Sequence, residues 1–497
     1  MSSAVHLPPE LIRFLSLRGP QSLVIRGPPG SGKTTLAVAL VESFPGHRLF
    51  VSSRVSRDDL TLGFPLLARD NGMLEVIDAS RVREPMRKVA TGLVRSLQNL
   101  VEGPTSGGEI ERFLWLPSPI QEAWSRLKPD VPAIVVIDTW DALVEKYLGV
   151  PLTPGEGPLP DRMEVERLLL DQMAESKAHV VLVLERPEET HLDYLVNGVV
   201  TTRGEMFDER LERWLHISKL RYLRVDNATY PFTLEGGRFE AITPTMQMVP
   251  PSLGVYDQDP DPNPRSLWPG SRAFAQAFGR LPFQRQTLVE CDDSVPEVGP
   301  TSIVLPAATH TLKQGGRVLV IPPPGLPAEE VYAVFAVRGS AEQLRDNLRI
   351  IQTNPQGAPT SSDVPAIVDP PTPDAEAQRS FWEFLRATPT ASRPMLIISY
   401  AEGLEMLQPG REPGNVFSTV ASAPREYLRS TKIHTMVIAR TSDPSLSTLR
   451  RLASLHIQLR NRVGRVFVYG VQPHTPGFVL IQQSGGSEGG YGLLRVV

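Results

Sequence analysis

The sequence predicts an α/β protein, with a mostly parallel central sheet and a late antiparallel hairpin in its first half and a second α/β domain after it. Two observations predict this fold. In the first half, short apolar runs alternate with helical stretches, which is typical of a parallel sheet covered by helices. In the second half, the order of strand, loop, helix and strand returns. Both halves are therefore expected to bury a sheet between helices.

Five apolar runs in the first half have the length expected of buried parallel strands: residues 22–26, 48–53, 74–79, 133–138 and 179–185. Two later segments, residues 214–225 and 229–242, alternate polar and apolar side chains more openly. They predict an edge hairpin with a turn at Gly236 and Gly237.

Chain length and proline spacing predict two large domains. The 497 residues exceed the roughly 100–200 residues of an ordinary domain. Residues 244–266 carry many prolines and little apolar periodicity, so they continue neither a helix nor a central strand. We therefore expect domains at residues 1–243 and 267–497, joined by a linker at residues 244–266.

The composition is that of a globular protein, with 41% hydrophobic and 21% charged residues and no apolar run near the roughly 18 residues that span a bilayer. The N-terminus lacks the pattern of a secretion signal, so we expect a cytoplasmic protein without membrane contact. The single cysteine, Cys291, excludes internal disulfides. A net charge of -4 provides no general attraction for nucleic acid.

The segment GPPGSGKT, Gly27 to Thr34, has the spacing of a triphosphate-binding loop and lies between an apolar run and a helix. Glycines let backbone amides surround the phosphates, and the helix directs its positive end at them. Lys33 is expected to neutralise the outer phosphates, and Thr34 to offer its hydroxyl to magnesium. We therefore predict ATP and Mg²⁺ as cofactors, with ATP bound by Gly27, Pro28, Pro29, Gly30, Ser31, Gly32, Lys33, Thr34 and Thr35.

Asp138 ends the apolar run VVID, about a hundred residues after the loop. A carboxylate at the end of a strand can hold the water shell of the magnesium ion, so Asp138 is the second predicted magnesium residue. The alternative is an aspartate that caps the next helix.

The KaiC-like branch of the RecA superfamily resembles this chain in the loop and in VVIDTWDAL, LDYLVNGVVTT and RWLHISKLRYLRVDNATYPFTLEGGRFEAI. The resemblance covers roughly residues 11–243, and the KLR triplet is its most specific part. The RVS triplet, together with one loop-bearing domain before a different one, also resembles the archaeal GvpD-like regulatory ATPases. The resemblance implies a RecA-like P-loop fold and a ring or filament, of which a hexamer is one form, with ATP between subunits.

The same resemblance implies that Lys219 and Arg221 reach from one subunit toward the γ-phosphate bound by its neighbour. Two positions apart on a strand, these residues point to the same face, which suits a clamp on one anion. The alternative is a solvated strand face, since Arg224 continues the alternation.

One departure from the family concerns catalysis. KaiC-like and RecA-like enzymes usually end the second strand in a glutamate that orients the attacking water, whereas this chain has Ser52, Ser53 and Arg54 there. Because a serine is a far poorer base, we expect slow hydrolysis of ATP to ADP and phosphate unless Glu185 or Asp58 substitutes. Together, the predicted catalytic residues are Lys33, Asp138, Glu185, Lys219 and Arg221.

The second half predicts a degenerate RecA/KaiC-like copy without a nucleotide site. DDSVPEVGPTS stands in place of the loop, and there Asp292 and Asp293 would repel phosphate. In PMLIISYAEGL, Ser399 stands in place of Asp138. The alternative is an unrelated α/β domain. We expect the second domain to provide contacts, for example to a protein partner.

The leading prediction for function is a regulatory ATPase or ATP-controlled switch. A DNA recombinase or repair paralogue is an alternative, and its sequence support is the basic stretch with Arg440, Arg450, Arg451, Arg460, Arg462 and Arg465. A run of this kind usually forms a solvated face or pairs with acids elsewhere, so nucleic-acid binding is the weaker expectation. Two further alternatives are a non-catalytic ATP-binding scaffold and a small-molecule kinase.

Overall fold

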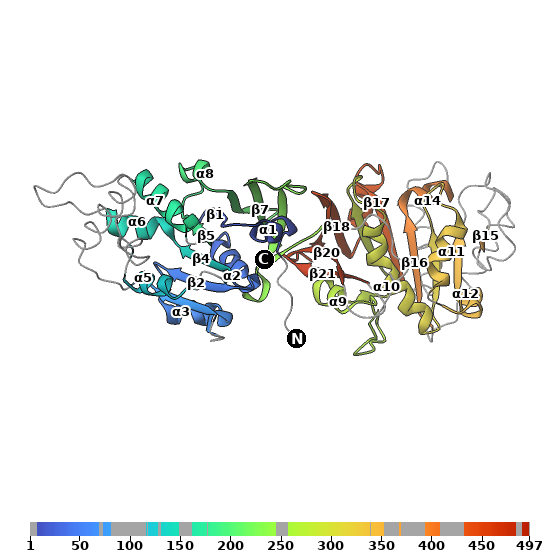
Figure 1. The fold of residues 1–497 in the computed structure, drawn as a ribbon. Helices are drawn as coiled ribbons and strands as arrows, with labels where there is room; N and C mark the ends of the chain where they lie inside the picture. Colours follow the sequence, from blue (N-terminus) through green and yellow to red (C-terminus); the bar gives the residue numbers. More distant parts are fainter. Residues whose placement is uncertain are drawn as a thin grey trace, which may run out of the picture. The chain divides into compact units, whose positions relative to one another are not determined.

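The computed structural model describes two compact units, residues 1–243 with 496–497 and residues 244–495. Within them it describes residues 7–68, 73–80, 116, 118–127, 131–148, 162–175, 177–244, 257–337, 339–351, 367–368, 393–407, 432–483 and 490–496. Each unit is an α/β domain with its own sheet and its own hydrophobic cores (Figure 1).

The first unit contains a nine-stranded sheet in the order β3-β2-β4-β5-β1-β6-β7-β8-β9 among the described residues. Its strands are β1 (Ser22–Arg26), β2 (His47–Ser52), β3 (Leu74–Asp78), β4 (Ala133–Asp138), β5 (Ala178–Val183), β6 (Gly198–Phe207), β7 (Arg210–Leu220), β8 (Thr229–Thr233) and β9 (Glu240–Ala241). The first five strands and β6 pair in parallel, and β6 to β9 pair antiparallel in succession. The predicted parallel sheet with antiparallel end strands is confirmed.

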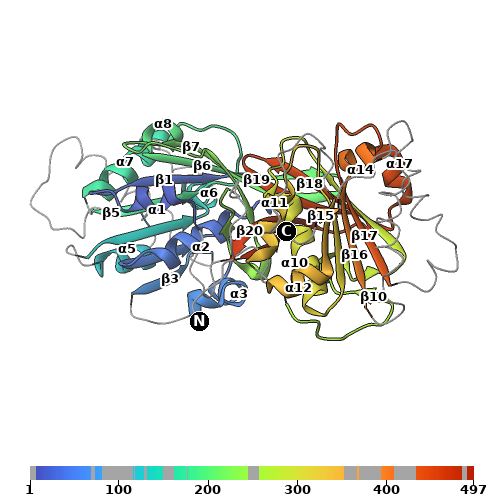
Figure 2. The ribbon, with the colours of Figure 1, turned by 90° about the vertical axis from the view of Figure 1, so that its right-hand side faces the viewer.

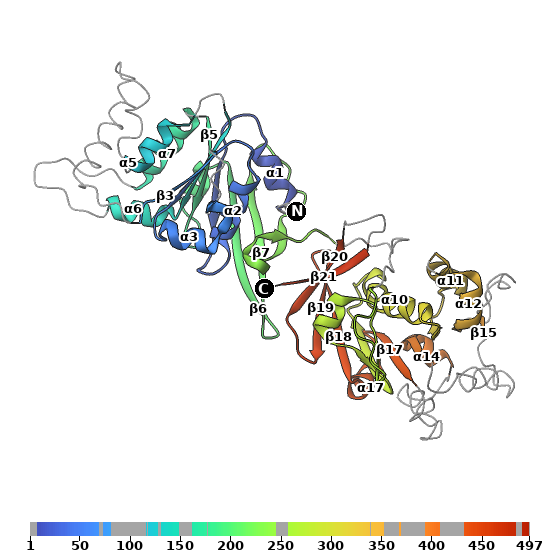
Figure 3. The ribbon, with the colours of Figure 1, turned by 90° about the horizontal axis from the view of Figure 1, so that it is seen from below.

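Helices cover both faces of this sheet, because alternate strand residues point to opposite sides. One core joins the sheet to α1 (Pro9–Leu15), α2 (Lys33–Ser43) and α3 (Arg57–Gly63), the last followed by the 3₁₀ turn η1 (Pro65–Ala68). The other core joins it to α5 (Ser118–Ser125), α6 (Trp140–Leu148), α7 (Arg162–Glu175) and α8 (Leu192–Leu195). Figure 3 shows the two helix groups on either side of the strands.

The strand pairing after β1 differs in two respects from the sequence prediction. The two predicted segments pair as β7 and β8, but residues 221–228 connect them; the predicted turn at Gly236 and Gly237 lies in the 3₁₀ turn η3 (Glu235–Gly237), which leads from β8 to β9. An additional strand, β6, was not predicted from the sequence; it forms a long antiparallel pair with β7 through a turn at Asp208 and Glu209. The outer half of β6, residues 203–207, is largely exposed and mixes charged with apolar residues, so β6 lacks the continuous apolar run that identifies the buried strands.

The second unit contains a ten-stranded sheet in the order β15-β14-β13-β16-β17-β12-β18-β19-β20-β21 among its described residues. The strands are β12 (Arg285–Cys291), β13 (Arg317–Ile321), β14 (Leu348–Ile351), β15 (Ile367–Val368), β16 (Met395–Tyr400), β17 (Ile433–Arg440), β18 (Leu455–Arg462), β19 (Arg465–Gln472), β20 (Gly477–Gln483) and β21 (Gly490–Arg495). A separate pair joins β10 (Ser266–Leu267) to β11 (Leu281–Pro282).

Helices also cover both faces of the second sheet. One core includes α9 (Arg272–Phe278), α10 (Val298–Lys313), α11 (Ala328–Ala336) and α12 (Ala341–Asn347), and the other includes α14 (Ala401–Leu407) and α17 (Leu446–Leu452). In Figure 2, α10 and α12 lie on one side of β16 and β17, and α14 and α17 are separate from them.

The two sheets have the same strand order. Strands β12, β13, β14, β16 and β17 of the second sheet occupy the places of β1 to β5 in the first, and β18 to β21 occupy the places of β6 to β9. The second sheet has β15 as an additional edge strand beyond β14. The connection from β1 to α2 occupies residues 27–32, and that from β12 to α10 occupies residues 292–297. This shared topology supports the interpretation of the second half as a copy of the first.

The predicted linker is partly built into the second unit. Asp257 accepts hydrogen bonds from Trp268 and Arg272, and Asp259 forms an ion pair with Arg280 at 2.6 Å.

None of the described helices is long and apolar enough to cross a bilayer.

Candidate functional site

The loop between β1 and α2, residues 27–32, lies at the carboxyl edge of the first sheet, where parallel α/β sheets bind ligands. The backbone conformation of this loop requires glycine at three positions. Gly27, Gly30 and Gly32 all have positive φ, and a Cβ atom on Gly27 would lie 2.2 Å from the Thr202 carbonyl oxygen. Because Gly32 ends the loop in the left-handed region, α2 begins at Lys33 with its amide end facing the loop.

Three side chains of the predicted ATP site converge at this edge. The Lys33 ammonium donates to the carbonyl oxygens of Gly27 at 2.7 Å and Pro28 at 2.9 Å, so it lies across the loop. The Thr34 hydroxyl donates to Oδ2 of Asp138 at 2.8 Å. The structure therefore brings together the lysine, the hydroxyl and the acid, although Asp138 is 104 positions from Thr34.

Burial dominates the electrostatics of this group. It raises the pKa of the Asp138 carboxyl, although the Thr34 hydrogen bond and the Lys33 charge act in the opposite direction. Burial also lowers the pKa of the Lys33 ammonium, against the attraction of Asp138 and Glu185. Burial therefore disfavours the charged forms of Asp138 and Lys33, and the attraction between the two side chains acts against it.

The residues also fit magnesium. Thr34 and Asp138 present hard oxygen atoms next to each other, and Mg²⁺ is commonly held by one or two protein oxygens together with waters and phosphate oxygens. A triphosphate would be held at the same place by the backbone amides of the loop, whose shape depends on Gly27 and Gly32 because a Cβ at these positions would meet Thr202 or Phe232.

The segment that replaces the usual glutamate is bound to the residue after Asp138. The Ser53 amide donates to the Asp138 carbonyl at 2.8 Å, and the Ser53 hydroxyl donates to the Thr139 carbonyl and accepts from its amide. Next in the chain, Arg54 contacts both oxygens of Glu185, with Nε–Oε1 at 2.6 Å and Nη2–Oε2 at 2.7 Å. Asp58, the other acid considered, is exposed in the first turn of α3.

Glu185 therefore lies beside the Asp138–Thr139 segment of the predicted ATP site. Besides Arg54, it accepts from the Thr139 hydroxyl at 3.3 Å, and its own amide donates to Asp141 at 2.8 Å. Glu185 and Arg54 stand out separately in the sequence, and in the structure they form a pair.

Lys219 and Arg221 contact α8 of the same chain. Lys219 is the second-last residue of β7, and its ammonium donates to the carbonyls of Asp193 at 2.8 Å and Val196 at 2.7 Å. Arg221 lies just beyond the strand, which ends at Leu220, and donates to the Tyr194 carbonyl at 2.8 Å. Burial and the nearby Arg221 charge lower the pKa of Lys219. Their predicted action across a subunit interface stays a prediction.

Two supporting interactions were missed by the sequence analysis. Ser31 of the loop lies 2.7 Å from the Thr202 hydroxyl on β6, which fixes the loop against the neighbouring strand. Arg26, the residue before the loop, is buried and forms an ion pair with Asp193 of α8. A charged residue ending an otherwise apolar strand was the available signal for Arg26.

At the corresponding edge of the second unit, acids are bound by protein groups. Glu297 accepts from Arg440 and, at 3.2 Å, from the Tyr400 hydroxyl. Asp293 accepts from the Ser442 hydroxyl at 2.9 Å. Ser399 pairs with Ile321 in the sheet, as Asp138 pairs with Ser52 in the first unit. This edge therefore holds acids that are already bound by other groups of the fold, and its loop at residues 292–297 has no lysine.

Several arginines of the predicted basic stretch are engaged within the fold. Arg440 contacts Glu297, Arg450 forms a two-point ion pair with Glu290, and Arg465 is fully buried. These contacts match the alternative interpretation, in which the arginines pair with acids elsewhere in the chain.

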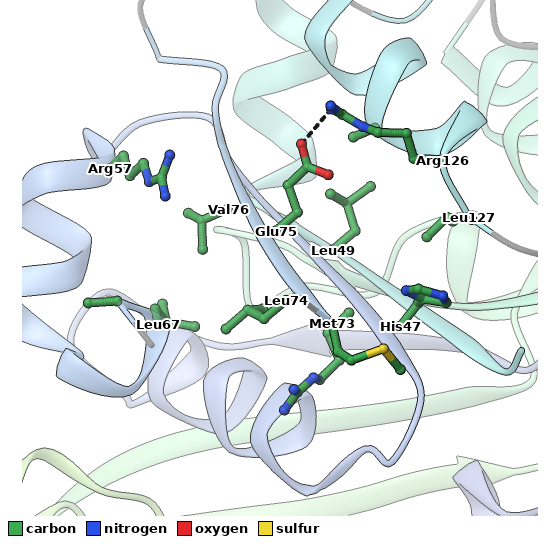
Figure 4. Close-up of a pocket in the computed structure, with 13 residues that line it drawn as sticks. His47, Leu49, Arg57, Leu67, Met73, Leu74, Glu75, Val76, Arg126 and Leu127 are labelled. Atoms are coloured by element: carbon green, nitrogen blue, oxygen red, sulfur yellow. Dashed lines mark hydrogen bonds and ion pairs between the residues drawn. The ribbon is translucent and has the colours of Figure 1, made fainter. Parts of the chain in front are cut away.

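A cavity of about 350 Å³ lies at a different place in the first unit, beside β2, β3 and the end of α5 (Figure 4). Its lining combines leucines with Arg48, Arg57 and Arg126, the last paired with Glu75 at 2.6 Å. No residue of the predicted ATP site lines this cavity.

Two proteins of Halobacterium salinarum are similar to this chain. Protein GvpD2 is 24% identical over 488 residues, which cover 95% of this chain and 92% of that protein. Protein GvpD1 is 26% identical over 350 residues, which cover 67% of this chain and 60% of that protein. No family model matches the chain. The predicted likeness to GvpD-like proteins is therefore confirmed, and the first alignment extends over most of both units.

Proposed function

We propose that this protein is an ATP-binding regulatory ATPase in which Mg-ATP bound at residues 27–35 controls the assembly of subunits. The observation that carries the proposal is the 2.8 Å hydrogen bond between Thr34 and Asp138 beside the Lys33 ammonium. The similarity to GvpD2 along 95% of the chain supports a role in which both units take part.

Each residue has a distinct task in this proposal. The loop amides and Lys33 bind the phosphates, Thr34 and Asp138 hold magnesium, and the ion neutralises charge on the phosphate oxygens. Glu185 orients a water molecule toward the terminal phosphorus. Lys219 and Arg221 act on the nucleotide of a neighbouring subunit, which requires them to exchange their α8 carbonyls for phosphate oxygens.

We expect slow hydrolysis. The second strand ends in Ser52, whose hydroxyl donates to the Val55 carbonyl at 2.6 Å, so no carboxylate extends from that strand end. Glu185 reaches the site from the neighbourhood of β5 and is already paired with Arg54. A turnover well below about 1 per second, the low end of ordinary enzymes, suits a switch.

The test measures nucleotide binding, phosphate release and molecular mass with and without Mg-ATP. Wild type should bind Mg-ATP and change its mass, whereas Lys33→Ala should lose binding at least tenfold. Arg18→Ala, which removes an exposed charge near the first strand, is the matched control. Binding without any mass or shape change would refute the switch, and wild-type affinity in Lys33→Ala would refute the site.

A further inference from the structure

The Arg54–Glu185 pair lies beside the proposed ATP site and has the form of an exchangeable contact. The guanidinium approaches both carboxylate oxygens, yet Arg54 is 55% exposed and Glu185 is 33% exposed. Exposed ion pairs contribute roughly 0–1 kcal/mol, so little free energy holds the two side chains together. Another anion with the same geometry could therefore displace the carboxylate.

The backbone of Arg54 is fixed next to the magnesium acid. Ser53 makes three hydrogen bonds to the Asp138–Thr139 segment, so Arg54 begins from a rigid point even though its side chain is exposed. On the other side, Thr139 donates to Glu185, and both Glu185 and Asp138 act electrostatically on Lys33. The arginine, the acid and the phosphate-binding lysine thus share one edge of the sheet.

A guanidinium binds phosphate oxygens with the same two-point geometry that it uses for a carboxylate. A terminal phosphate beside Lys33 would also repel the Glu185 carboxylate, which favours an exchange of partners.

We propose that Arg54 binds the terminal phosphate of ATP within its own subunit. Arg54 leaves Glu185 to do so, and the freed carboxylate then orients the attacking water. This inference rests on the proposed function and names its regulation. In the hydrolytic step, the water oxygen bonds to the terminal phosphorus while the bond from that phosphorus to the ADP oxygen breaks. Glu185 takes the water proton, and ADP leaves with the electron pair of the broken bond. With ADP alone, Arg54 stays on Glu185.

Arg54 is therefore a determinant of the preference for ATP over ADP. Mg-ATP and Mg-ADP affinities are measured by titration calorimetry, and phosphate release in single turnover, for wild type, Arg54→Ala, Arg54→Lys and Glu185→Gln. Arg57→Ala removes an exposed arginine three residues away and is the control. Thermal unfolding verifies that each variant folds.

Arg54→Ala should bind ADP as wild type does but bind ATP about tenfold more weakly, the loss of one charge-assisted contact. Arg54→Lys should recover part of that difference, because it restores the charge without the two-point geometry. Glu185→Gln should retain the ATP preference and lose phosphate release.

Equal effects of Arg54→Ala on ATP and ADP, or no difference from Arg57→Ala, would overturn the role of Arg54 while leaving the proposed function intact. Failure of wild type to bind either nucleotide, or no effect of Lys33→Ala on binding, would overturn both. The two failures are therefore distinguishable.

Discussion

The hydroxyl of Thr34 donates to Asp138 across 2.8 Å and joins the start of α2 to the end of β4. The acid is 8% exposed, and burial raises its pKa. A buried carboxylate costs desolvation free energy unless a ligand uses its charge. In the proposed function, the magnesium ion uses that charge.

The first prediction follows from this pair. Asp138→Asn should weaken magnesium-dependent ATP binding by roughly 10- to 100-fold, the usual effect of removing a group that supports a metal. Its ligand-free form should be at least as stable as wild type, because the amide still accepts from Thr34 without a buried charge. Calorimetry with and without Mg²⁺, together with denaturant unfolding, measures both quantities.

The control is Thr61→Val, which removes a hydroxyl that donates to the backbone of its own helix α3. An Asp138→Asn protein that unfolds more easily but binds Mg-ATP normally would assign Asp138 to the structure and not to the metal.

Much of the fold was predictable because its strands are buried on both faces. The apolar runs VVID and SLVIR identify β4 and β1 without any knowledge of their neighbours. The order of parallel strands then brings their carboxyl ends to one edge, so Asp138 and the loop could be predicted to meet. The strand β6 could not be identified in this way, since its last residues face water.

The partners of charged residues were not predictable. Arg54 and Glu185 are 131 positions apart, and they meet because β2, β4 and β5 are neighbours in the sheet. Lys219 and Arg221 were expected on one strand face, but β7 ends between them. Alternation along a strand gives the direction of a side chain and says nothing about the carbonyl groups that α8 places in its path.

The second prediction concerns the action of Arg221 between subunits. Arg221→Ala should bind ATP normally but lose most phosphate release, while Lys33→Ala should lose binding. If Arg221 acts on a neighbour, mixing the two inactive variants should restore activity at about one quarter of randomly formed interfaces, where an intact loop faces an intact arginine. Phosphate release from the mixture measures this recovery.

Arg224→Ala is the matched control, since Arg224 is 89% exposed and pairs with Asp226. The absence of any recovery on mixing would show that Arg221 acts within its own chain, for example through its contact with Tyr194.

The third prediction concerns a buried ion cluster in the second unit. Glu290 on β12 is fully buried and accepts from Arg450 at 2.7 and 2.8 Å, from His456 at 2.9 Å and from Gln458 at 2.8 Å. Burial alone would raise the pKa of Glu290, but hydrogen bonds from His456, Arg450 and Gln458 outweigh it and lower the pKa to about 2.

The sign of the pH dependence follows from this lowered pKa. The unfolded chain binds a proton near the ordinary glutamate pKa of 4.5, whereas the folded protein does so near 2. The stabilisation by Glu290 is therefore complete above 4.5 and is lost as the pH falls toward 2. Glu290→Gln should show a weaker loss of unfolding free energy over that interval.

Removing the Arg450 guanidinium at neutral pH provides the complementary measurement. Arg450→Ala should lower the free energy of unfolding by about 2 kcal/mol, less than the roughly 3–5 kcal/mol for a fully buried pair, because this arginine is 48% exposed. Arg451→Ala, on the same helix α17, removes an exposed side chain that donates to the Thr448 hydroxyl at 3.2 Å, and it should change the free energy of unfolding by less than about 0.5 kcal/mol. Denaturant unfolding at several pH values compares the variants. Equal stability of Arg450→Ala and Arg451→Ala would show that His456 and Gln458 suffice to hold the buried carboxylate, whereas parallel acid transitions for Glu290→Gln and wild type would show that folding does not lower the pKa of Glu290.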